Sequence, residues 1–206
     1  MIEFLKSIPV TLGLTTAAIL LFVFPEFGDL LEYDTSSLPL QQPIQWLGCH
    51  LLHWSSSHLF WDLGMFALLG AICERIDFKR YGGLLLLTAF AIPVSVAFSN
   101  PELSTYRGLS GLDTALFAMA TVHLGLERLK DKDTAGLLIY VALFLAMTFK
   151  IGNELTSGTT MFVEGNEFTP VPIAHAVGAV LGCLIALVRS TTCESLDRRQ
   201  PSQLPA

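Results

Sequence analysis

The sequence predicts an all-α membrane protein built as a bundle of six transmembrane helices. Of its 206 residues, 52% are hydrophobic and 15% are charged, and the mean hydropathy is +0.57. This composition is too apolar and too poor in charge for an ordinary water-soluble domain. Six apolar runs are separated by polar or charged segments, and Lys and Arg gather on alternate segments. Both patterns are typical of a protein that crosses the bilayer repeatedly.

The first apolar run covers residues 10–24. No small-residue cleavage site follows it, so we expect a retained helix and not a removed signal. An acidic loop then leads to an amphipathic run over 44–54, which is too short to cross about 30 Å of hydrocarbon and is expected at the interface. The remaining predicted spans are 58–73, 81–98, 108 to the charged segment at 127–133, 134–151 and 173–188, with a loop at 152–172.

The basic residues predict the orientation. Of the 12 Lys and Arg residues, only Arg107 and Lys150 fall on the side opposite the N-terminus. The positive-inside rule therefore predicts that both termini face the cytoplasm. Residues 1–190 would form one six-span domain, and 191–206 a polar cytoplasmic tail.

Several classes of ligand are not expected. No basic patch with interleaved aromatic residues is present, which argues against a nucleic-acid partner. The cysteines lack metal-ligand spacing and lie at different predicted depths, so we expect neither a disulfide nor a metal site. They are Cys49, Cys73, Cys183 and Cys193. No organic cofactor is implied.

Three polar residues fall in one layer of the predicted bundle. His58, Ser110 and His175 each stand near the start of a helix that enters from the outer side. At about 1.5 Å per residue, all three lie within roughly two turns of that surface. A serine becomes nucleophilic when an imidazole takes its proton, and a second imidazole with nearby backbone N–H groups can stabilise an oxyanion. This layer therefore predicts acyl transfer by a Ser–His dyad, with no carboxylate needed to orient the base.

Small residues at helical spacing predict that the fourth and sixth spans pack closely, because the backbones of transmembrane helices can approach where side chains are small. The rows are Gly111, Ala115 and Ala118 on the fourth span, and Ala174, Gly178 and Gly182 on the sixth.

Three motifs of the sequence resemble those of a known protein family. Gly108-Leu109-Ser110-Gly111 resembles the G-x-S-G nucleophile motif of the rhomboid intramembrane serine proteases. Residues 174–182 resemble their sixth-helix A-H-x-x-G-x-x-x-G motif, which includes Gly178 and Gly182. His58 to Asp62 is similar to the second-helix H-x-x-x-N motif, and His53 falls where a rhomboid histidine is often found.

The resemblance implies a rhomboid-like bundle and a role for each matching residue. Ser110 would be the nucleophile, His175 the general base and His58 an oxyanion donor. Further support for the site is expected from Asp62, Gly108, Leu109 and Gly111, with additional support from His53, Asp113 and Thr114.

The chain is closer still to the rhombosortase subgroup. Tyr-x-Gly-Leu-Ser-Gly at 106–111 and His-Leu-x-Trp before an acid at 58–62 carry this resemblance. It implies a bacterial inner-membrane enzyme whose site opens to the outer side of the bilayer. The implied substrates are exported proteins with a C-terminal Gly-Gly, an apolar helix and a basic tail.

Three positions depart from the rhomboid pattern. Asp62 replaces the usual Asn, and it either donates as a protonated acid or pairs with His58 one turn away. Thr114 stands where many rhomboids have a Tyr against the base, and Trp46 is followed by Leu47 and not by Arg. We expect a structural hydrogen bond for Asp113 and interfacial positions for His50 and His53.

Two other functions fit the same residues. A catalytically inactive rhomboid-like protein would bind transmembrane helices without cutting them. A small proton-coupled transporter would use Asp62, Asp113 and the histidines as a relay, although no inverted repeat supports it.

Overall fold

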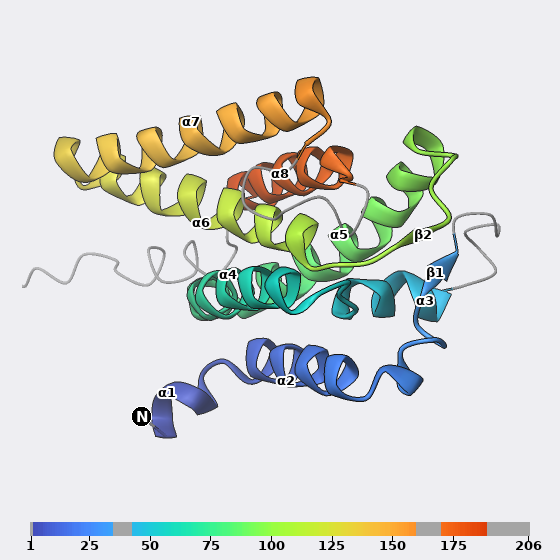
Figure 1. Ribbon diagram of the computed structural model, residues 1–206. Helices are drawn as coiled ribbons and strands as arrows, with labels where there is room; N and C mark the ends of the chain where they lie inside the picture. The colour runs from blue at the N-terminus through green and yellow to red at the C-terminus, as the bar shows by residue number, and fades with distance from the viewer. Residues whose placement is uncertain (1, 35–42, 160–169, 189–206) are drawn as a thin grey trace, which may run out of the picture.

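The computed structural model describes residues 2–34, 43–159 and 170–188, which are mostly α-helical (Figure 1). The tail expected at 191–206 lies outside these residues. Tyr33 pairs with Tyr106 in a short antiparallel ladder between β1 and β2. In chain order the elements are α1 (Ile2–Lys6), α2 (Pro9–Val23), η1 (Pro25–Phe27), β1 (Tyr33–Asp34), α3 (Pro43–Gly48), η3 (Cys49–Leu51), α4 (Ser56–Ile76), α5 (Phe78–Ser99), β2 (Thr105–Tyr106), α6 (Ser110–Lys130), α7 (Thr134–Ser157) and α8 (Pro172–Leu187).

Each apolar run of the sequence forms a long helix. Among the described helices, α5 and α7 are long and apolar enough to cross a bilayer by themselves, while α2 and α8 are apolar but have 15 and 16 residues. Six membrane crossings therefore stay a prediction. The predicted end of the fifth span is wrong, because α7 continues to Ser157 through the segment expected to be a loop from residue 152.

Helix α6 is the central element of the bundle (Figure 1). It contacts α4, α5, α7 and α8, and its contact with α8 is the most extensive of any pair of described elements. Helix α2 packs against α4 on one side, and α7 lies on the opposite side of the bundle. The N-terminal ends of α6 and α8 are therefore held next to each other.

The first long helix is tied to the bundle by a buried acid. The carboxylate of Glu74 on α4 accepts hydrogen bonds from the backbone N–H groups of Val10 and Thr11 and from the Thr11 hydroxyl. These N–H groups belong to the first turn of α2 and have no partner within the helix. Glu74, which is only 3% exposed, thus caps α2 from a neighbouring helix.

The segment before α4 is anchored by an aromatic side chain. The Trp46 ring on α3 is buried and makes edge contacts with Phe90 at 5.6 Å and Tyr33 at 6.4 Å between centroids. The amphipathic run predicted at 44–54 is α-helical only in its first part, since α3 ends at Gly48 and η3 follows it directly. Leu47, which departs from the rhomboid pattern, is 42% exposed.

Glycines allow the close contact of α6 with α8. A methyl group at Gly178 would collide with the backbone carbonyl of Gly111, and one at Gly182 would collide with that of Ala115. Backbone atoms cannot move aside as a flexible side chain can. The small-residue rows thus bring the start of α8 against the start of α6.

We expect Gly178→Ala to destabilise the protein, because the added methyl group must push α8 away from α6. Overpacking of this kind costs about 1–3 kcal/mol. Thermal unfolding in detergent measures the effect, and Gly64→Ala is the matched control because, in the part of the chain that the structure describes, nothing lies within 4 Å of its added Cβ. Equal melting temperatures for the two variants would contradict the close contact.

Candidate active site

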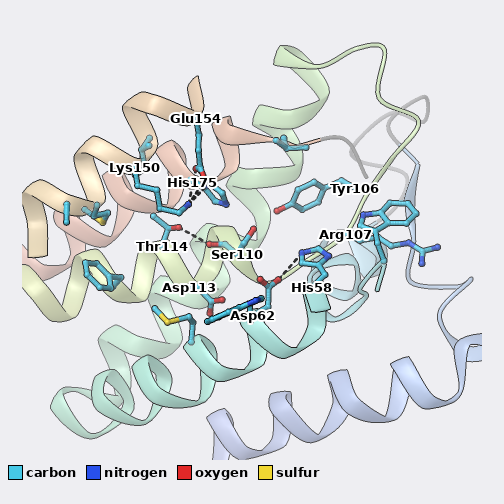
Figure 2. A pocket seen from close by; sticks show the side chains of 18 of the residues that line it. His58, Asp62, Tyr106, Arg107, Ser110, Asp113, Thr114, Lys150, Glu154 and His175 are labelled. Atoms are coloured by element: carbon cyan, nitrogen blue, oxygen red, sulfur yellow. Dashed lines mark hydrogen bonds and ion pairs between the residues drawn. The ribbon is translucent and has the colours of Figure 1, made fainter. Parts of the chain in front are cut away.

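A pocket of about 580 Å³ opens where α4, α6 and α8 begin and α7 ends (Figure 2). His58, Ser110 and His175 all line it, so the three residues expected in one layer face one cavity. Most of the remaining wall is apolar, with Trp54, Trp61, Met65, Leu103, Phe117, Ala146, Met147, Phe149, Ile151 and Val171. An apolar cavity with a few convergent polar groups is the usual form of a ligand or active site.

Ser110 is the first residue of α6, and this position supplies N–H groups as well as a hydroxyl. The first backbone bond of the helix joins Asp113 N–H to the Leu109 carbonyl. Among the described residues no side chain caps this end. The N–H groups of Ser110 and Gly111 therefore lack acceptors within the helix, and helix N-termini of this kind stabilise negative charge.

The loop that carries Ser110 requires a glycine. Gly108 has φ 121°, where L side chains are strained, and a Cβ there would lie 2.9 Å from His58 Nε2. Its N–H donates to the Cys49 carbonyl. The ring nitrogens of His50 lie 3.2 Å from the Gly108 carbonyl and 3.1 Å from that of Ala89. His50 is buried and not interfacial as expected, and it fixes this loop to α5.

Asp62 connects the loop to two imidazoles. Its Oδ2 accepts a hydrogen bond from Leu109 N–H at 2.9 Å and lies 3.3 Å from His53 Nε2 and 3.2 Å from His58 Nε2. Three nitrogens around one oxygen fit an ionised carboxylate that pairs with imidazoles. They do not fit a protonated Asp62 that donates from this oxygen, so the pairing alternative is the better interpretation.

This cluster changes two expectations. The Leu109 N–H is bonded to Asp62, and it is therefore not the group that would bind an oxyanion. His53 is 6% exposed, and its ring packs edge-on against the His58 ring at 5.1 Å. It is part of the buried cluster and not an interfacial residue.

His175, on the first turn of α8, contacts a carboxylate that the sequence interpretation missed. Its Nδ1 lies 2.7 Å from Glu154 Oε2 on α7. Lys150 Nζ lies 2.8 Å from Glu154 Oε1 and 2.9 Å from Oε2 (Figure 2). The sequence-based expectation that no carboxylate orients the His175 imidazole is therefore wrong, because Glu154 contacts it. The sequence predicts a loop at Glu154, although this residue follows Met147 and Ile151 at helical spacing and all three are buried on α7.

Ser110 and His175 face the same pocket but are not bonded to each other. Within the described residues no hydrogen bond joins the Ser110 hydroxyl to the His175 ring; such bonds are often long in enzymes without substrate. Because Nδ1 of His175 is bonded to Glu154, Nε2 is the nitrogen that remains for Ser110. Thr114 does not hold the base, since its hydroxyl donates to the Ser110 carbonyl at 2.8 Å.

Two buried polar atoms at the pocket have no hydrogen-bond partner among the described residues: Asp113 Oδ1 and the Tyr106 hydroxyl. The interhelical hydrogen bond expected for Asp113 is therefore not found at this oxygen. In Figure 2 the Tyr106 hydroxyl points toward Ser110. Buried polar groups of this kind normally find a partner, so both atoms are available to a bound ligand.

Arg107 forms the rim of the pocket beside β2. Its guanidinium lies 2.9 Å from Glu32 and 4.4 Å from the centroid of the Trp54 ring. The ion pair and the cation–π contact join the β2 segment to the segments before α3 and α4. They thereby hold the loop that leads into Gly108.

Comparison with known families identifies the family of the chain. The model of the family described as Rhomboid domain matches residues 40–192, which include every residue of the pocket. A search of curated proteins found no match to the chain. Because the family model covers well over half of the chain, the protein belongs to the rhomboid family of intramembrane serine proteases and is a multi-pass membrane protein.

Proposed function

We propose that the protein is an active intramembrane serine endopeptidase in which Ser110 is the nucleophile and His175 the general base. The observation that carries the proposal is the shared pocket: the first residue of α6 and the buried imidazole of α8 line one cavity at the end of the bundle. The G-x-S-G resemblance at 108–111 supports the same assignment.

In the proposed reaction, Ser110 Oγ attacks the scissile carbonyl carbon while its proton passes to His175 Nε2. The new C–O bond gives a tetrahedral oxyanion, which the N–H groups of Ser110 and Gly111 stabilise. His58 would add a donor, as the resemblance implies, and the Tyr106 hydroxyl faces the same space. The C–N bond then breaks, and the proton on His175 moves to the leaving amine.

Hydrolysis completes the cycle. A water molecule attacks the acyl-enzyme and gives its proton to His175, the C–O bond to Ser110 breaks, and the serine recovers its hydrogen. The acid product leaves with the upstream part of the substrate. Ser110 and His175 thus return to their starting protonation states.

The proposed substrates are transmembrane segments of exported proteins, cleaved near the outer face of a bacterial inner membrane. Rhombosortase-type processing of C-terminal Gly-Gly tails is the specific form that we propose, and the resemblance at 58–62 and 106–111 supports it. In the topology predicted from the sequence, 10 of the 12 Lys and Arg residues fall on the side of the N-terminus, which supports cytoplasmic termini.

Co-expression with a candidate substrate tests the proposal. The substrate is a secreted protein with a C-terminal Gly-Gly, an apolar helix and a basic tail, and the expected result is a shortened product that requires both Ser110 and the Gly-Gly pair. Cleavage of other transmembrane segments but not of this tail would keep the protease and reject the rhombosortase assignment. Capture of the tail without cleavage would favour an inactive binder, and proton flux into vesicles without cleavage would favour a transporter.

We expect Asp62→Ala to lower kcat/KM by about a hundredfold, because it removes the acceptor of the Leu109 N–H and the partner of two buried imidazoles. Asp62→Asn keeps an oxygen for the Leu109 N–H and should lose only about tenfold. Cleavage of one substrate by both variants and the wild type measures the series. An Asn variant with full activity would show that the carboxylate charge is unnecessary.

A further inference from the structure

We propose that Glu154, held by Lys150, is a positioning residue that fixes the orientation and tautomer of His175, so that the reacting centre is a Ser–His–Glu arrangement. This inference rests on the proposed function, since it assigns a role in the same reaction. The residues come from three helices: Ser110 from α6, His175 from α8 and Glu154 from α7.

The geometry singles out one nitrogen of the imidazole. The 2.7 Å distance from His175 Nδ1 to Glu154 Oε2 is that of a short, charge-assisted hydrogen bond. The Glu154 side chain is 1% exposed and that of His175 is 9% exposed, so water hardly competes for this contact. A carboxylate accepts and does not donate, and His175 Nδ1 must therefore carry the proton.

Lys150 sets the position of the carboxylate. It stands one turn before Glu154 on α7, and its Nζ lies within 2.9 Å of both carboxylate oxygens. The same Nζ is 3.5 Å from His175 Nδ1, at the edge of hydrogen-bond distance. The ammonium supplies a permanent positive partner for Glu154 when the imidazole is neutral, and the buried carboxylate can stay charged throughout the cycle.

A purely structural ion pair does not need this arrangement. Lys150 and Glu154 are neighbours on one helix and would satisfy each other on α7 alone. Glu154 instead directs an oxygen across the helix interface at the imidazole of His175, which lines the same pocket as Ser110. Apart from Lys150, Glu154 and His175, the charged or titratable side chains that line the pocket in the described part of the chain are His58 and Asp62 on α4, Tyr106 on β2, Arg107 just after β2, and Asp113 on α6.

The consequence for the reaction is specific. With the proton fixed on Nδ1, the lone pair of Nε2 is free to take the Ser110 proton as the oxygen–carbon bond forms. The imidazolium that results is stabilised by Glu154 until Nε2 returns the proton to the leaving amine. Glu154 neither gains nor loses a proton, so no further reactant is required.

Glu154→Gln is the first test. The amide keeps the shape but can donate to Nδ1, which would place the proton on Nε2 and block proton transfer from Ser110. We expect kcat to fall about 10²- to 10⁴-fold, as the wrong tautomer does in serine proteases. KM should change by less than about threefold, because Glu154 acts through His175 and not on the substrate.

A double variant covers the case in which a buried amide prevents folding. Lys150→Met with Glu154→Leu replaces the ion pair by apolar groups of similar size, which buried sites often tolerate. We expect the double variant to fold and to show the same loss of kcat. Glu74→Gln is the matched control: it changes an acid of similar burial away from the pocket, and it should lower the melting temperature without lowering kcat.

The outcomes separate this inference from the proposed function. A folded Glu154→Gln or double variant with kcat within about threefold of the wild type would overturn the positioning role, while Ser110-dependent cleavage would still stand. A wild-type protein that neither cleaves nor labels with a fluorophosphonate would overturn the proposed function and this role with it. The inference is supported if the folded variants of Lys150 and Glu154 lose kcat at constant KM while Glu74→Gln does not.

Discussion

Replacing Ser110 with Ala is expected to abolish cleavage while the protein stays folded. The substitution removes the only atom proposed to form a bond with the substrate, and loss of a catalytic serine costs about 10⁶-fold in kcat in serine proteases. Ser110 stands at the first position of α6, where Ala is accommodated without strain. Time-resolved cleavage of a purified substrate in detergent or vesicles measures the loss, and cross-linking measures binding, which should persist.

Ser95→Ala is the control for this substitution. Ser95 is on α5, an apolar helix long enough to cross a bilayer, and its hydroxyl is satisfied by the Ala91 carbonyl of its own helix, away from the pocket. Its activity should stay within about twofold of the wild type. Residual cleavage by Ser110→Ala at more than about one hundredth of the wild-type rate would assign the nucleophile to another residue.

Gly108→Ala should also produce a large loss of activity. Gly108 has a positive φ that strains any L side chain, and the added Cβ would approach His58 Nε2 to 2.9 Å and Asp62 Oδ2 to 3.3 Å. The loop before Ser110 must therefore shift together with the Asp62 cluster. Because a misplacement of about 1 Å can cost about a hundredfold, we expect kcat/KM to fall by at least that factor.

Gly158→Ala separates backbone strain from damage to the site. Gly158 also has a positive φ, of 69°, but it ends α7 and no atom of the described residues lies within 4 Å of its added Cβ. Its substitution should cost about 1 kcal/mol of stability and leave kcat/KM nearly unchanged. If Gly108→Ala behaved like Gly158→Ala, the contacts of Gly108 with His58 and Asp62 would not be what positions Ser110.

The main features of the fold could be predicted because they depend on local pattern. Apolar runs locate the long helices, and their boundaries agree with the structure within a few residues for α2, α5 and α8. Ser110, His58 and His175 each lie near the start of a helix, and these three helices run in the same direction. The three residues are therefore expected at the same depth, at one end of the bundle. The close contact at Gly178 also follows from the spacing of small residues along α6 and α8.

The missed features depend on contacts between distant segments. Glu154 follows Gly152 and Asn153, which favour loops, and its helical position is held by packing and by its contact with His175. Two partners of Asp62, His53 and Leu109, lie before α4 and before α6, and no periodicity connects them to Asp62. His50 is buried because the Gly108 loop folds over it, which its interfacial-looking surroundings did not indicate.

The central claim is that Ser110 and His175 form one reacting centre, and covalent labelling tests it most directly. The folded wild-type protein is treated with a fluorophosphonate, and the adduct is located by peptide mass spectrometry in parallel with His175→Ala. In the wild-type protein we predict one adduct, on Ser110. In His175→Ala the same adduct should form only at the background rate. An adduct on another residue, or Ser110 labelling at an unchanged rate without His175, would contradict the account.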